Sequence, residues 1–276
     1  MHMNLYHYTD QSGFMGIFNS RTLWATKIQY LNDSNEYYLA AILASRIINE
    51  RINNESDFDV KFTYQEFLGK IQLISNVNVC VCSLTEQGDL LSQWRGYSKK
   101  MGGYSIGFDF EGIKSIANAR GFELVKCIYD ESEQNEKIES IINDSIALVG
   151  EGVKNGINRK SIDYFEEEFI RLAPVLKDKS FAEEAEWRLI SIVKTMSLSF
   201  RAGNSMLIPY NGLYLGSKGE LKNILKEVIL GHTPNVNLAK QATQLFLVNT
   251  LLDPRDFPIS FYPFNILESS VPYRNW

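Results

Sequence analysis

The spacing of apolar residues switches several times between the period of a strand and that of a helix, and the first switches fall within residues 5–26. Residues 5–9 (LYHYT) alternate as the two faces of a strand do. Asp10 then stands where a helix N-cap is expected, before helical spacing over 11–19. A second strand over 22–26 follows almost at once. The opening of the chain therefore predicts a strand, a capped helix and a strand in close succession.

Helical and strand patterns are interspersed along the rest of the chain. Periodic apolar positions predict helices over 36–51, 63–75, 90–97 and 236–249. The polar stretch 53–59 predicts a break between the first two. Alternation and short apolar runs predict strands over 77–83, 104–108, 122–129, 186–193, 206–209 and 227–230. Because no βαβ period repeats, the pattern favours an α+β fold over a doubly wound α/β fold.

One long segment, residues 131–176, is charged and has weakly amphipathic helical faces. We interpret it as a helical insertion that packs over the sheet. A chain of 276 residues with 45% hydrophobic content can bury a full core. We therefore expect a single domain over 1–276 that carries this insertion.

Charge and cysteine content narrow the function classes. The net charge is -5 and the 28 basic residues are scattered, so no stripe for non-specific nucleic-acid binding is evident. Neither a charged leader nor a run of ~20 apolar residues is present, so we expect a soluble, cytoplasmic protein without membrane contact. Cys80 and Cys82 share a strand face and are expected to be buried, reduced thiols. No partners stand at metal-ligand spacing, and we expect no metal.

Histidines are few, and His7 is the first candidate for chemistry. The chain has no G-x-S-x-G elbow, phosphate loop or dinucleotide fingerprint. His7, with Tyr8 and Thr9 beside it, stands at the end of the first predicted strand, where it can offer a hydrogen bond to a sugar hydroxyl or an amide. The alternative is a half-buried histidine bonded to the backbone.

Two acidic residues form the second candidate group. Glu184 and Glu186 stand at strand spacing on one face, and such a pair raises the pKa of one carboxyl unless a cation intervenes. Paired carboxylates can hold a ribose hydroxyl and stabilise an oxocarbenium-like sugar. The alternative is an exposed acidic strand entry paired with Arg188.

The stretch from Ser83 to Phe108 places three further candidates on a short predicted helix. Trp94 and Tyr97 can stack on a nicotinamide or adenine ring, and Arg95 can pair with a pyrophosphate. The alternative is that Trp94 packs in the core and that Arg95 is merely exposed.

Four ordered motifs carry a resemblance to a known family. They are LYHYT...GIFNSRTLWAT...YLNDSNE, LLSQWRGYSKKMGGYSIGF, EAEWRL and SSVPYR, the last ending at Arg274. Together they resemble the bacterial domain-of-unknown-function family 2971, which includes AbiGi-type abortive-infection proteins of phage defence.

A second resemblance concerns chemistry. His7-x-Thr9, Gly16-Ile17 and Leu23-Trp24 are similar to the first motif of ADP-ribosyltransferase-fold proteins, including DNA-modifying DarT toxins and tRNA 2′-phosphotransferases. This likeness implies a split antiparallel/mixed β-sheet with surrounding helices. It also implies that His7, Tyr8 and Thr9 bind NAD, that Glu186 is catalytic and that Glu184 orients the acceptor. For the central nicotinamide-pocket motif the competing residues are Ser83, Trp94, Tyr97 and Tyr104.

These resemblances imply an NAD-dependent mono-ADP-ribosyltransferase, with NAD as substrate and with NAD-hydrolysing activity as a variant. We expect a bacterial toxin or phage-defence effector that acts on a protein or nucleic-acid acceptor and has an antitoxin or other protein partner. Two alternatives stay open. One is a non-catalytic module that senses a nucleotide or a phage component, and the other is a nucleic-acid-modifying enzyme.

Overall fold

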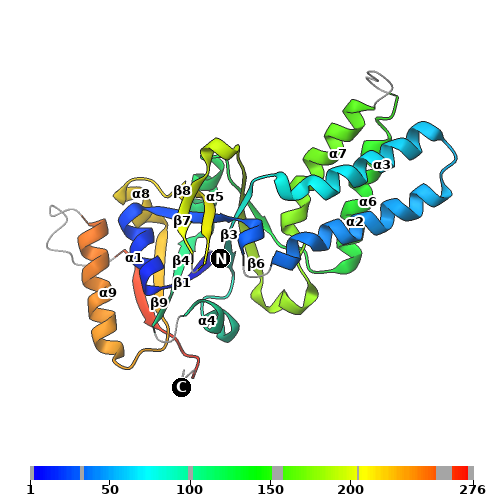
Figure 1. The fold of residues 1–276 in the computed structure, drawn as a ribbon. Coiled ribbons are helices and arrows are strands. Elements are labelled where there is room, and N and C mark those ends of the chain that lie inside the picture. Colours follow the sequence, from blue (N-terminus) through cyan, green and yellow to red (C-terminus); the bar gives the residue numbers. More distant parts are fainter. Residues whose placement is uncertain are drawn as a thin grey trace.

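The computed structural model describes residues 3–31, 34–98, 102–150, 158–203, 205–252 and 263–272, with the backbone alone at 34–37. A β-sheet with its own helices occupies one side of the molecule, and a helical bundle extends from the other side (Figure 1). The α+β class predicted from the sequence is confirmed.

Within the described residues the strands form one ten-stranded mixed sheet. The strands are β1 (Asn4–Asp10), β2 (Thr22–Lys27), β3 (Val79–Thr85), β4 (Gly103–Asp109), β5 (Glu123–Lys126), β6 (Glu186–Ile192), β7 (Ser199–Ala202), β8 (Leu207–Tyr214), β9 (Leu225–Leu230) and β10 (Asn265–Glu268). The main path runs β10-β9-β4-β1-β3-β2-β8-β7, and β6 joins β3 to β5. β10 runs parallel to β9, and the other pairs are antiparallel.

The sheet divides at β3. One edge of β3 pairs with β6 along its whole length. On the other edge, β2 pairs at Val81 and Cys80, whereas β1 pairs only at Thr85. Residues 82–84 therefore lie between two diverging arms, β1-β4-β9-β10 and β2-β8-β7. This divergence creates an opening along the edge of β3.

The main core lies between the sheet and the helices that follow its strands. These are α1 (Gln11–Ser20), α5 (Phe110–Asn118), α8 (Lys218–Ile224) and α9 (Val236–Leu251), while the short α4 (Leu91–Tyr97) lies near the opening. Buried side chains such as Phe14, Phe108 and Leu247 join helices and strands in one cluster. Asp10 caps α1 as predicted, because its Oδ1 accepts a hydrogen bond of 2.7 Å from the Gly13 N–H.

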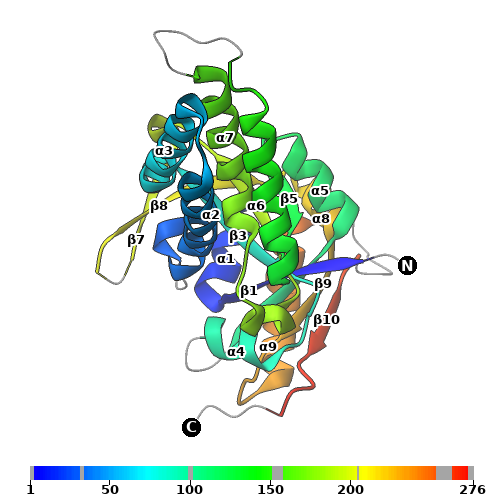
Figure 2. The ribbon, with the colours of Figure 1, turned by 90° about the vertical axis from the view of Figure 1, so that its right-hand side faces the viewer.

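A second core holds the helical bundle together. Its helices are α2 (Ser34–Asn54), α3 (Phe58–Leu73), α6 (Glu131–Ile146) and α7 (Arg159–Leu172), which Figure 2 shows side by side. The rings of Phe67 and Phe165 stack at 4.2 Å, and those of Phe165 and Phe169 stack at 5.4 Å. The same cluster includes Val81 and Ile190 of the sheet, so the bundle is anchored on β3 and β6.

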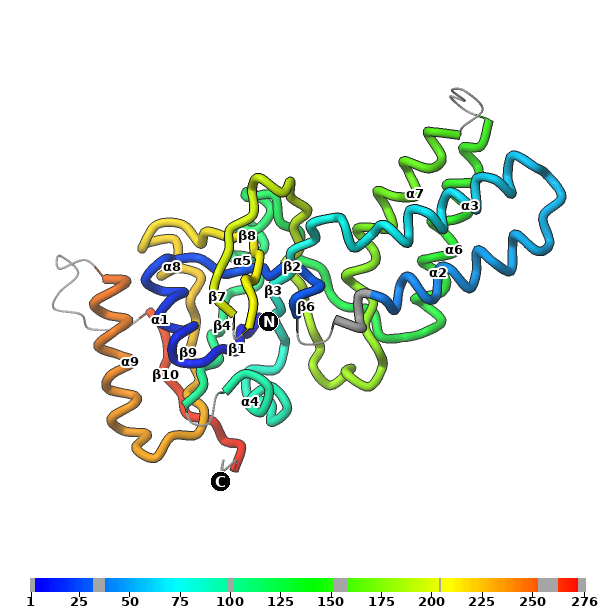
Figure 3. The backbone as a smooth tube through the Cα atoms, viewed as in Figure 1, coloured from blue at the N-terminus to red at the C-terminus, as the bar shows by residue number. Residues whose placement is uncertain are grey.

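The predicted insertion 131–176 is therefore only half of this bundle. It contributes α6 and α7, whereas α2 and α3 come from the connection between β2 and β3, as the chain trace shows (Figure 3). The bundle packs against one part of the sheet and extends away from it, in place of the predicted cover over the sheet. The single-domain organisation stays a prediction.

Several elements differ from those expected. The short 3₁₀ helices are η1 (Ile28–Tyr30), η2 (Ile74–Asn76), η3 (Ala173–Val175), η4 (Lys179–Glu184) and η5 (Thr195–Ser197). α3 begins at Phe58, inside the predicted break 53–59, because Asp57 accepts hydrogen bonds from two N–H groups of its first turn. The sequence pattern does not predict α5, α8, β7 or β10. Asn32 and Asp33 of the YLNDSNE motif and Arg274, which ends the SSVPYR motif, lie outside the described residues.

Two further sequence expectations concern cysteines and membranes. Cys80 and Cys82 are buried in the same cluster, and Cys127 is buried as well; among the described residues these three cysteines form no disulfide bond, as predicted. In the part of the chain that the structure describes, no helix combines the length and the apolar character needed to cross a membrane.

Candidate functional site

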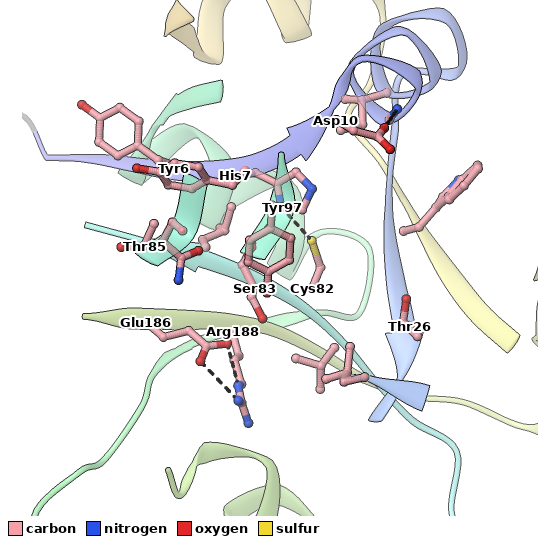
Figure 4. A pocket seen from close by; sticks show the side chains of 18 of the residues that line it. Tyr6, His7, Asp10, Thr26, Cys82, Ser83, Thr85, Tyr97, Glu186 and Arg188 are labelled. Carbon is pink, nitrogen blue, oxygen red and sulfur yellow. Dashed lines mark hydrogen bonds and ion pairs between the residues drawn. The ribbon is translucent and has the colours of Figure 1, made fainter. Parts of the chain in front are cut away.

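A cavity of about 450 Å³ opens where the two arms of the sheet part. Strands β1, β2, β3 and β6 and helices α1 and α4 contribute to its wall (Figure 4). Its polar lining includes His7, Thr26, Ser83, Gln93, Tyr97, Lys177, Glu184, Glu186, Arg188 and Arg201. The structure thus brings together residues that lie almost 200 positions apart in the chain.

His7 stands over the unpaired edge of β3. Its Nδ1 lies 3.0 Å from the backbone oxygen of Ser83 and 3.7 Å from the Cys82 sulfur. Because a carbonyl oxygen only accepts, Nδ1 carries the hydrogen, and in the neutral ring Nε2 is then an acceptor. Burial lowers the pKa of His7, against the smaller raising effect of the hydrogen bond to Ser83. His7 is therefore bonded to the backbone, which agrees with the alternative interpretation, and it also lines the cavity.

Glu186 forms the buried centre of an ionic group at the other side of β3. Its side chain is only 5% exposed, and it accepts hydrogen bonds of 2.6 Å from Lys177 Nζ and 2.9 Å from Arg188 Nε. Arg188 also donates to the backbone oxygen of Pro174 at 2.7 Å. The alternative interpretation is confirmed for the pairing with Arg188 and is wrong for the exposure of the strand entry, because both side chains are buried.

Glu184 belongs to the same ionic group, but it does not lie on the strand where it was expected. It ends η4 and does not lie on β6, because Ala185 takes a left-handed conformation (φ 41°) that turns the chain between the two acids. Its carboxylate nevertheless contacts Lys177, which thus bridges Glu184 and Glu186. The close approach of the acids is real, but strand spacing is not its cause.

The neighbouring cations Arg188 and Lys177 keep the Glu186 carboxyl ionised. Burial alone would raise the pKa of Glu186, but the charges of Arg188 and Lys177 and their hydrogen bonds lower it to about 2. Glu186 is therefore an anion at neutral pH. Its backbone N–H also donates to the hydroxyl of Tyr129 at 2.9 Å, which fixes the start of β6.

The three candidate residues of helix α4, Trp94, Arg95 and Tyr97, lie in different environments. Trp94 is 3% exposed, packs edge-on against Tyr8 at 4.8 Å and donates from Nε1 to Asp89 at 2.7 Å. Its position is that of a core residue, the alternative foreseen for it. Arg95 is exposed and is not among the cavity-lining residues, whereas Tyr97 lines the cavity and is 42% exposed.

The neighbours of His7 on β1 have structural contacts. The Tyr8 hydroxyl donates to the Gln87 backbone oxygen and accepts from the Leu90 N–H, and burial raises its pKa to about 12. Part of Tyr8 still lines the cavity. Thr9 is not among the lining residues. A Cβ on Gly13 would lie 1.9 Å from its Oγ1, so Thr9 packs beneath the first turn of α1.

The polar lining includes Lys177, Gln93, Thr26 and Arg201, which the sequence pattern does not single out, and the bond from His7 to Ser83 is not predicted either. Gln93 had a usable signal, because it precedes Tyr97 by four positions and so shares its helix face. Lys177 had none, since it follows a charged helical segment that contains many similar residues. Among the described residues no group of three or more His, Cys, Asp or Glu side chains is placed to hold a metal ion.

The stretch from α4 to β6 matches a known family. Residues 93–189 match a family described as "Protein of unknown function (DUF2971)". This match confirms the predicted resemblance over these residues, and the description of the family names no activity. No curated protein matches the chain, and no solved structure does. The likeness to AbiGi-type proteins and to the ADP-ribosyltransferase fold stays a prediction.

Proposed function

We propose that the cavity binds NAD and that the protein transfers ADP-ribose from it, with water as the acceptor when NAD is hydrolysed. The observation that supports this most is the shared cavity of His7 and Glu186. The two residues come from strands on opposite edges of β3, and both line the same space of about 450 Å³. That volume is in the range of small-molecule sites.

His7 is suited to hold the nicotinamide ribose. Its hydrogen-bond donor is occupied by the Ser83 carbonyl, so its second nitrogen accepts a hydrogen bond from a ribose hydroxyl. The lowered pKa keeps the ring neutral, which preserves this acceptor at neutral pH. Tyr97 offers an aromatic face for the nicotinamide ring, and the Gln93 amide can bond to the carboxamide.

Glu186 supplies the negative charge that the reaction needs. The bond between ribose C1′ and the nicotinamide nitrogen breaks, and its electron pair moves to that nitrogen, which neutralises the ring. The ribosyl group left behind carries positive charge, which the ionised Glu186 stabilises at short range. An acceptor hydroxyl, amine, base nitrogen or water then attacks C1′, and the proton that it loses passes to solvent water. Glu184 stands beside Glu186 to orient the acceptor.

The test is release of nicotinamide from NAD. We expect the wild-type protein to release it, and Glu186→Gln to be slower by about 10²-fold or more. Glu86→Gln is the matched control, because Glu86 also bonds to a lysine and to a second donor, Lys126 and Trp187, but is not a lining residue. Equal rates for wild type and Glu186→Gln would refute the catalytic role.

Folding must be separated from chemistry in this test. Removing the charge of Glu186 leaves Lys177 and Arg188 with less compensation, so the variant loses stability. Glu184→Gln leaves the bond between Glu186 and Arg188 in place and provides a second variant. We expect it to retain hydrolysis of NAD and to lose transfer to an acceptor.

One observation favours a second function, a non-catalytic nucleotide sensor. Both carboxylate oxygens of Glu186 already accept hydrogen bonds from Lys177 and Arg188, as in a structural ion-pair network. Calorimetry with NAD distinguishes the two functions. Heat of binding without any nicotinamide release would favour the sensor.

The biological role that accompanies the proposed activity is that of a bacterial toxin or phage-defence effector. Induced expression in a bacterial host is the direct assay. We expect the wild-type chain to slow growth and Glu186→Gln to relieve the effect at equal protein level. Equal growth with both chains would argue against toxicity through NAD.

A further inference from the structure

A second polar group lies at the end of the cavity away from Glu186. Arg201 of β7 donates from Nη2 to the hydroxyl of Thr26 on β2 at 3.1 Å, and both residues line the cavity. Figure 4 shows Thr26 on the opposite side of the pocket from Glu186 and Arg188, with Cys82 and Ser83 between them. The cavity therefore has two chemically distinct ends.

Among the described residues, the guanidinium of Arg201 has few hydrogen-bond partners. Of its five N–H donors, the described residues bond one, to Thr26, and its Nε is buried without a partner. Those residues supply it with no carboxylate. By contrast, Arg188 at the other end is bonded to both Glu186 and the backbone. A buried donor without a partner is unfavourable, and an anionic ligand on the same guanidinium can offset that cost.

An aromatic side chain stands beside this cation. The Arg201 guanidinium lies 5.5 Å from the centre of the Trp24 ring, and Trp24 packs at 5.0 Å on Tyr210. Trp24 is 42% exposed and lines the cavity, unlike the buried Trp94. A planar ring with a fixed cation next to it fits a base linked to phosphate.

We propose that Arg201 and Trp24 form a subsite for the diphosphate and base of an adenine dinucleotide. This inference rests on the proposed function, since it places the adenosine diphosphate half of NAD at this end and leaves the nicotinamide ribose between His7 and Glu186. Arg201 neutralises the diphosphate, and Trp24 stacks on the base. Both are binding residues and take no part in bond cleavage.

ADP is the probe that tests the subsite without any chemistry. We expect calorimetry to show ADP binding to the wild-type protein and a loss of about tenfold or more in affinity for Arg201→Gln. Trp24→Leu should weaken ADP and adenosine alike, whereas Arg201→Gln should weaken ADP only. The matched control is Arg120→Gln, because Arg120 also lies over an aromatic ring, that of Tyr214, but is not a lining residue.

Each outcome separates this proposal from the catalytic one. ADP binding that depends on Arg201, without release of nicotinamide from NAD, would support the subsite and contradict the enzyme. Unchanged ADP affinity in Arg201→Gln, or no ADP binding by the folded wild type, would overturn the subsite even if NAD is cleaved. A thermal melt of Arg201→Gln and Trp24→Leu confirms that both variants are folded.

Discussion

Glu186 is an ionised carboxylate that the fold holds out of water between two cations. At the level of single residues, the ionisation of such a buried carboxylate depends on the cations that contact it, here Lys177 and Arg188. Its pairing with Arg188 is visible in the sequence, because residues two apart on a strand share a face. The bridge from Lys177 is not, since it requires the fold of the segment that precedes η4.

The ion-pair group should make stability depend on acid pH. Glu186 has a pKa of about 2 in the folded protein and an ordinary value near 4.5 when unfolded, so its stabilisation is present above the unfolded pKa and is lost as pH falls from about 4.5 toward 2. The contribution is on the order of 3 kcal/mol. Urea unfolding across this range should show a larger loss for wild type than for Glu186→Gln. Parallel curves would contradict the ion-pair assignment.

His7 should remain neutral into weakly acidic solution. Its folded pKa is lowered by burial, so below the ordinary value of 6.5 protons favour the unfolded state, and this residue's share of stability is lost as pH falls. Nitrogen NMR of the ring should show hydrogen on Nδ1 and a midpoint below 6.5. A midpoint above 6.5, or hydrogen on Nε2 alone, would contradict the contact with Ser83.

At the scale of elements, α4 shows what periodicity can and cannot decide. Gln93 and Tyr97 face the cavity while Trp94 faces the core, as helical spacing requires once one face is known. The sequence pattern predicts the helix at 90–97 but does not show which of Trp94, Arg95 and Tyr97 faces the site. Only the packing against β1 shows which face is turned toward the site.

The loop before α4 is fixed by Asp89, which joins it to the end of the chain. Its carboxylate accepts hydrogen bonds from Trp94 Nε1, from both hydroxyls of Ser269 and Ser270, and from the Ser270 N–H. We expect Asp89→Asn to lower stability by about 2 kcal/mol, because an amide puts a donor against the Ser270 N–H. Hydrogen exchange should then accelerate at 265–270. Ser269→Ala, which removes one bond, should have a smaller effect, and equal effects would argue against a shared hub.

At the scale of the whole molecule, the cleft arises from the divergence of two arms at β3. Composition and pattern predict an α+β chain with most of its strands, because alternation is a local property. They do not predict which strands are neighbours, and so the contact between β1 and β3 at Thr85 and the four-helix grouping had to come from the fold. For the same reason the sequence does not show that Arg201 lines the same cavity as His7.

The bundle and the sheet share one hydrophobic cluster through β3 and β6. A mutation in the bundle should therefore lower the stability of the bundle and the sheet together. Phe165 is fully buried between Phe67 and Phe169, and Phe165→Ala should cost about 3–5 kcal/mol. Calorimetric melting should move as one transition to lower temperature. A separate early transition confined to 34–76 and 131–176 would show that the bundle unfolds alone.

A crystal structure with NAD bound would show whether His7 and Glu186 bind the same ligand. The predicted result is a nicotinamide ribose between His7 Nε2 and the Glu186 carboxylate, with the diphosphate toward Arg201. Density for NAD at another surface, or NAD in this cleft with its nicotinamide ribose away from both residues, would contradict the account.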